Sequence, residues 1–183
     1  MSAYSPWPED DSELWESLQL SDFPVQDAGT PALSVDSTVS LTTRLLGAKQ
    51  AGEVISVHTV DQRTWSIRLA AIGTTWFSGE TTHPRRGVLI SLHAVVRVET
   101  FSNTVTDTAP VGAPLSRALA VTAATSRWVR ASVPGARDTG ELVGIASDHV
   151  SLRRTGLDGH STLHQVPFGQ LIAIEFVEPG DIS

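Results

Sequence analysis

One stretch occurs twice in this sequence, as Leu45-Leu46-Gly47-Ala48-Lys49-Gln50-Ala51-Gly52-Glu53-Val54-Ile55-Ser56-Val57 and as Val133-Pro134-Gly135-Ala136-Arg137-Asp138-Thr139-Gly140-Glu141-Leu142-Val143-Gly144-Ile145. Both copies begin with an apolar pair, turn through Gly-Ala and a cation, reach Gly-Glu, and continue into apolar residues. Glycine supplies the backbone freedom that a turn needs, and Val, Ile and Leu fit a half-buried strand. Each copy therefore predicts a β-hairpin.

The similarity extends beyond the hairpin, which favours a duplicated unit. The matching blocks are residues 39–57 with 127–145, Trp65–Arg68 with Val150–Arg153, and Ile90–Glu99 with Val166–Glu175. The spacing between blocks changes only where loops are expected. We therefore expect two copies of one β-rich unit.

Alternating apolar and polar residues predict the strands of both copies. The expected strands are 39–45, 52–60, 64–71, 87–92 and 95–101 in the first copy, and 127–133, 140–147, 149–154, 161–167 and 170–177 in the second. Residues 74–86 are expected to form an irregular excursion, and the Ala- and Leu-rich residues 115–125 a helix. The predicted division is an acidic segment with a short helix (1–35), a first domain (36–101), a linker (102–114) and a second domain (115–178).

Composition excludes several classes of site. The 183 residues include no cysteine, so disulfides, zinc-thiolate sites and cysteine nucleophiles are absent. The net charge of −7 divides unevenly, because residues 1–40 hold eight acids and no Lys or Arg, while the rest holds twelve acids and thirteen bases. No apolar run reaches the roughly 20 residues that span a bilayer. We expect a bacterial, cytoplasmic protein without a membrane segment.

The acidic segment mixes carboxylates with large apolar side chains, a composition typical of peptides that fold against a partner. The candidate partner-binding residues are Trp7, Leu14, Trp15, Leu18 and Phe23. Two alternatives stay open, namely that the short helix expected near residues 11–20 caps the first domain, or that the segment is simply disordered.

A helix followed by five short strands, with Gly-Glu opening the second strand and an Asp turn entering the third, as in Asp148-His149-Val150-Ser151-Leu152, resembles Sm and Sm-like proteins. The chain is also similar to tandem Sm-like proteins of actinobacteria, some of them labelled Fis family regulators. The resemblance implies a mainly β fold of two tandem five-stranded Sm-like or SH3-like small barrels, each preceded by a short α-helix. It also implies self-association through barrel edge strands.

In Sm-like proteins an Asn after the Asp turn and an Arg-Gly or Lys-His-Ala motif near the fifth strand bind RNA. Of these, His93-Ala94 matches and the Asn and Lys do not. The candidate nucleic-acid-binding residues are Arg85, Arg86, His93, Arg153 and Arg154.

The sequence contains no nucleophile elbow, phosphate loop, zinc-protease pair or dinucleotide fingerprint. Although His160 and His164 share a face if both lie on one strand, no carboxylate completes a metal site by spacing. We therefore expect no catalytic residue, cofactor or metal.

The leading interpretation is a non-enzymatic adaptor or regulatory module that binds an unknown protein partner. The alternatives are an RNA- or DNA-binding regulator and, third, a small-ligand-binding or enzymatic domain.

The acidic segment also predicts a test of the nucleic-acid alternative. If the segment screens the arginines, deleting residues 1–35 will raise affinity for single-stranded RNA or DNA, and the gain will shrink with added salt. Binding isotherms of both forms at two salt concentrations measure this. Unchanged affinity would contradict the screening hypothesis.

Overall fold

The computed structural model describes residues 40–100, 112–124, 126–156 and 158–178. All of them belong to one compact unit, Ser37–Ser183. The acidic segment 1–35 with its expected helix, and residues 102–111 of the expected linker, lie outside the described residues.

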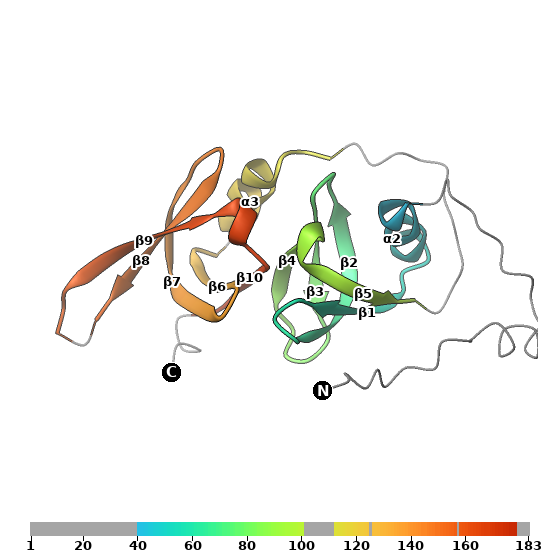
Figure 1. The fold of residues 1–183 in the computed structure, drawn as a ribbon, viewed down its shortest axis with the longest axis horizontal. Coiled ribbons are helices and arrows are strands. Elements are labelled where there is room, and N and C mark those ends of the chain that lie inside the picture. The colour runs from blue at the N-terminus through green and yellow to red at the C-terminus, as the bar shows by residue number, and fades with distance from the viewer. Residues whose placement is uncertain (1–39, 101–111, 125, 157, 179–183) are drawn as a thin grey trace, which may run out of the picture. The chain divides into compact units, whose positions relative to one another are not determined.

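The described residues form two halves with the same order of elements (Figure 1). The first half contains α2 (Leu41–Gln50), β1 (Val54–Thr59), β2 (Thr64–Ile72), β3 (Trp76–Thr81), β4 (Gly87–Ser91), the 3-10 turn η1 (Leu92–Ala94) and β5 (Val95–Glu99). The second half contains α3 (Leu115–Ala123), β6 (Trp128–Val133), β7 (Ala136–Ile145), β8 (His149–Thr155), β9 (Ser161–Pro167), the 3-10 turn η2 (Phe168–Gln170) and β10 (Ala173–Phe176).

The ten strands form one antiparallel sheet in the order β5-β1-β2-β3-β4-β10-β6-β7-β8-β9. Each half contributes its fifth, first, second, third and fourth strands in that order, so the two halves share one topology. The sheet is open rather than closed, and β4 of the first half pairs with β10 of the second. The predicted mainly β fold is confirmed, whereas the two tandem five-stranded barrels are not seen, because all ten described strands belong to one open sheet.

The central strands β4 and β10 are buried on both faces. On β4, Val88 and Ile90 face the core of the first half, whereas Leu89 faces that of the second. On β10, Ala173 belongs to the first core and Ile174 to the second. A strand covered on both faces has a continuous apolar run instead of an alternating pattern. This explains the sequences Val-Leu-Ile and Leu-Ile-Ala-Ile at the centre of the sheet.

The expected strand 39–45 is wrong, because residues 41–50 form helix α2. Ser40 caps this helix, since its Oγ accepts a hydrogen bond from the Thr43 N–H at 3.1 Å. Leu45 and Ala48 lie one turn apart and are both buried against the sheet. The alternation of Val39, Leu41, Thr43 and Leu45 is compatible with a strand, but the cap at Ser40 and the helical spacing of Leu45 and Ala48 stabilise a helix instead.

The hairpin predicted for the first copy is therefore also wrong, whereas the hairpin predicted for the second copy is present as β6 and β7. Gly52, with φ of +68°, ends helix α2, and the N–H of Glu53 bonds the carbonyl of Ala48 at 3.0 Å as in a Schellman motif. Gly135, with φ of +75°, lies instead in the two-residue turn between β6 and β7. The two stretches share positive-φ glycines but form different structures.

Of the three matched blocks, the last agrees with the topology, because η1 and η2 occupy equivalent places between the fourth and fifth strands. The block that aligned Trp65–Arg68 with Val150–Arg153 does not, since it aligns β2 with β8. The expected excursion at 74–86 contains a regular strand, β3. The other expected strands and the helix at 115–125 are present, with ends shifted by a few residues.

A buried carboxylate joins the two halves beside the β4–β10 pairing. Glu175 on β10 is 5% exposed. Its Oε1 accepts a hydrogen bond from Nη1 of Arg63, in the turn between β1 and β2, at 2.7 Å. Its Oε2 lies 3.9 Å from Nη1 of Arg130 on β6. Arg63 also stacks over the Trp65 ring, 3.7 Å from the centroid, so the cation is held in place from the first half.

We predict that Glu175→Ala will lower the free energy of unfolding by about 2–4 kcal/mol, because it leaves two partly buried guanidinium groups without their shared anion. Urea denaturation measures the loss. Glu80→Ala is the matched control, since Glu80 also binds an arginine, Arg85, but its side chain is 48% exposed, and surface pairs contribute only about 0–1 kcal/mol. Equal losses in the two variants would contradict a special role for Glu175.

Candidate interaction surface

Strands β5 and β9 are the two ends of the described sheet, and each pairs with one described neighbour. Both carry large apolar side chains on the outside of the protein. Val96 on β5 is 67% exposed and Leu163 on β9 is 60% exposed. An edge strand with exposed apolar side chains and unpaired backbone groups is a template for strand addition.

These two edges are equivalent to the strands that already pair at the centre. Strand β9 is the fourth strand of its half, as β4 is, and β5 is the fifth, as β10 is. At the centre, Ala173 pairs with Ile90, Ile174 with Leu89 and Glu175 with Val88. The same register at the two edges would place Arg97 opposite Val166, Val98 opposite Gln165 and Glu99 opposite His164. The protein therefore carries one complete junction and the two separated halves of a second.

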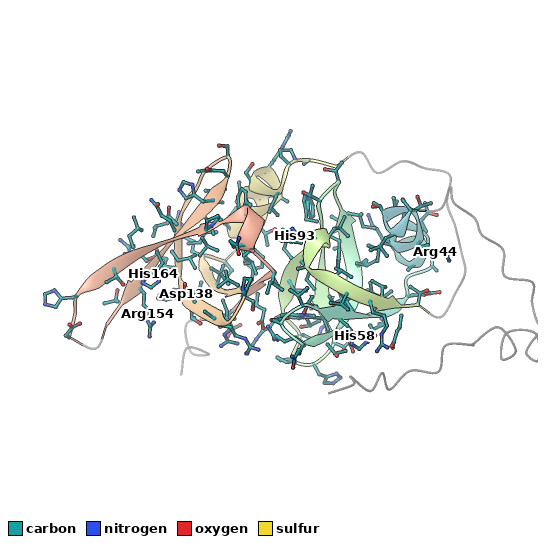
Figure 2. All side chains as sticks on the ribbon, viewed as in Figure 1. Arg44, His58, His93, Asp138, Arg154 and His164 are labelled. Carbon is teal, nitrogen blue, oxygen red and sulfur yellow. The ribbon has the colours of Figure 1, made fainter. Side chains whose placement is uncertain are left out.

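Charged side chains accompany both edges. Glu99 on β5 accepts from Arg97 at 3.0 Å and lies 3.3 Å from the Nε2 of His58. On the other edge, the Nδ1 of His164 lies 3.4 Å from a carboxylate oxygen of Asp138 (Figure 2). The equivalent register brings the carboxylate of Glu99 toward the imidazole of His164.

The candidate nucleic-acid-binding residues are spread over three places. Arg85 and Arg86 lie in the connection between β3 and β4, Arg153 and Arg154 lie on β8, and His93 lies in η1. Figure 2 shows His93 and Arg154 well apart, in different halves.

Two of these arginines are held by carboxylates of the same sheet. Arg85 donates two hydrogen bonds to Glu80, at 3.0 and 2.9 Å, and Arg153 donates to Glu141 at 2.6 Å. A guanidinium that already binds a carboxylate has fewer donors for a phosphate. The candidate partner-binding residues Trp7, Leu14, Trp15, Leu18 and Phe23 lie outside the described residues.

Sequence reasoning missed the edge residues Val96 and Leu163. Both are apolar residues within predicted strands, so the sequence pattern predicts that they are buried in the core. Their exposure depends on which strands end the sheet, and strand order is not visible in a periodic pattern. The edge strands could have been found only from the strand order of the repeated unit, in which the fourth and fifth strands lie at the two ends.

Among the described residues, no group of three or more His, Asp or Glu side chains is arranged to hold a metal ion. Within the same part of the chain, neither helix has the length and apolar character needed to cross a bilayer.

The sequence matches no protein-family model, and comparisons with curated proteins and with solved structures found no match.

The Arg85 contact predicts a measurable titration. The hydrogen bond from Arg85 holds the pKa of the exposed Glu80 carboxyl below its ordinary value. Arg85→Gln will raise this pKa toward that value, as followed by carbon-13 NMR of the side-chain carboxyl. Arg154→Gln is the control and will leave it unchanged. If Arg85→Gln also leaves it unchanged, the arginine is free for other ligands.

Proposed function

We propose that this protein is a non-enzymatic binding module that works through protein–protein contacts, and that its sheet edges make those contacts. The observation that carries the proposal is the equivalence between the open edges β9 and β5 and the buried pair β4 and β10. The first contact is with other copies of the chain, β9 of one copy pairing with β5 of the next. We also propose a cytoplasmic location, in line with the absence of cysteine.

The proposal follows from the geometry of a repeated unit. A contact between two different patches is head-to-tail, so it joins copies into a ring if the rotation closes and into a filament if it does not. The β4–β10 junction already relates one half to the next within the chain. If β9 of one chain pairs with β5 of the next in the same way, each added chain extends the assembly by two halves. Such growth is expected of tandem Sm-like units that assemble through edge strands.

Exposed apolar side chains support the same edges as contact sites. Val96 and Leu163 are among the six large apolar side chains that are notably exposed in the described residues, and each lies on an end strand. Pairing of the edges would cover them and would satisfy the outward backbone groups of both strands. A nucleic-acid role receives less support, because Arg85 and Arg153 are paired with carboxylates.

Lysine on an edge strand disfavours strand addition, so single Lys substitutions test the proposal. Light scattering of the wild-type protein is expected to give a mass well above that of one chain. Val96→Lys and Leu163→Lys will each give a monomer, because every head-to-tail contact needs one β5 and one β9. An equal mixture of the two variants will form a one-to-one dimer, since each supplies the edge that the other lacks.

Val121→Lys is the matched control, because Val121 is 69% exposed but lies on helix α3, away from both edges. This variant should assemble as the wild type does. A monomeric wild-type protein would refute self-association, and failure of the mixture to dimerise would refute its head-to-tail direction.

A further inference from the structure

A cavity of about 440 Å³ lies where the two halves meet, within the size range of small-molecule sites. Its walls come from the β2–β3 turn, the end of β4 and η1 in the first half, and from the start of α3, the β7–β8 turn and η2 in the second. The lining residues are Thr74, Thr75, Ser91, His93, Pro114, Leu115, Ser116, Ser147, Phe168 and Gly169.

The cavity is lined by neutral hydrogen-bonding groups. Five of the ten residues carry a hydroxyl, one is the histidine His93, and none is Asp, Glu, Lys or Arg. Figure 2 shows His93 between the two halves. Hydroxyls and an imidazole N–H donate hydrogen bonds, and no carboxylate in the lining repels an anion.

Helix α3 begins at this cavity. Its N-cap residue is Pro114, which makes no side-chain cap, so the first N–H groups of the helix have no side-chain acceptor. Two contacts with the first half fix the position of this end. The indole Nε1 of Trp76 donates to the carbonyl of Ala113 at 2.9 Å, and Gly112 packs so closely on Gly73 that an added Cβ would lie 2.6 Å from its Cα.

An independent feature is the hydroxyl of Ser91. Ser91 is 1% exposed, and its Oγ has no hydrogen-bond partner. Along β4, Val88 and Ile90 face the first core, so Ser91 points with Leu89 toward the second half, where α3 and η2 line the cavity. A buried hydroxyl without a partner destabilises the fold, because the group has lost its hydrogen bonds to water. A ligand in the cavity would remove this loss.

We propose that the cavity binds the phosphate group of a small phosphorylated molecule. The phosphate lies at the N-terminus of α3, where the N–H groups and the helix dipole favour an anion. Ser91, Ser116 and His93 donate hydrogen bonds to its oxygens. The volume beyond one phosphate accommodates an organic part next to Phe168. No residue of β5 or β9 lines this site, although η1 adjoins β5 and η2 adjoins β9.

Nitrogen-15 NMR titration of the full chain with inorganic phosphate and with glycerol phosphate tests the proposal. We expect saturable shifts at the amides of Leu115 and Ser116 with at least one of the two. Tighter binding of glycerol phosphate identifies a phosphate ester as the ligand class, and equal binding identifies free phosphate. No saturable shift with either, or shifts with single-stranded oligonucleotide alone, would overturn the proposal.

Two variants separate binding from folding. Ser116→Asp places a carboxylate in the first turn of α3, which favours the helix but repels a phosphate, so binding will be lost while the melting temperature is kept or raised. Ser91→Ala will weaken binding about tenfold without lowering the melting temperature, because the hydroxyl has no partner in the protein. Ser66→Asp and Ser66→Ala, on the exposed face of β2, are the matched controls. Wild-type affinity in Ser116→Asp and Ser91→Ala would overturn the assignment.

Discussion

The pairing of β4 with β10 is the constraint on which the rest of this structure depends. Each of these strands is apolar on both faces, so neither half could leave its own central strand exposed without losing much of its buried area. Together they give each core the residues that it lacks. The carboxylate of Glu175 adds an electrostatic requirement, since the cations that neutralise it come from both halves. The halves are therefore bound by shared packing and by a shared charge.

The same pairing determines which surfaces remain open. A repeated unit with a fourth and a fifth strand at its ends has two edges, and joining two units uses one edge of each. The remaining edges are of the same two kinds that pair at the centre. Carbonyl and N–H groups at such edges favour a further strand, and the exposed Val96 and Leu163 increase the apolar area that pairing would bury. Association and internal folding thus rely on one kind of contact.

The junction also creates the cavity beside it. Residues of the β2–β3 turn and of η1 come within reach of helix α3 because β4 and β10 lie side by side. The start of α3 is held by Trp76 and Gly112, so its first N–H groups have a fixed direction. The unpartnered Oγ of Ser91 is a consequence of this arrangement. It points away from its own half, and the protein offers it no hydrogen-bond partner.

Glycine positions explain why part of the local prediction was wrong. Gly52 and Gly135 both adopt positive φ, and a similar run of residues surrounds each. A positive-φ glycine ends a helix as readily as it turns a hairpin, so composition around it does not separate the two. The separating signal was Ser40, which caps the helix twelve residues earlier. Where the signal was longer, as in the strands after Glu53 and after Ser126, the prediction agreed with the structure.

The sequence by itself determined the class of fold, nearly all of the strands, the helix at residue 115 and the existence of a repeated unit, because periodicity and turn residues are local properties. Only the tertiary structure decided that the halves share one sheet, that Glu175 is buried between two arginines, that β5 and β9 form the edges, and that Ser91 faces a cavity. Each of these depends on which strands become neighbours. Strand neighbours are selected by packing between residues far apart in the chain, and no local pattern of residues encodes that choice.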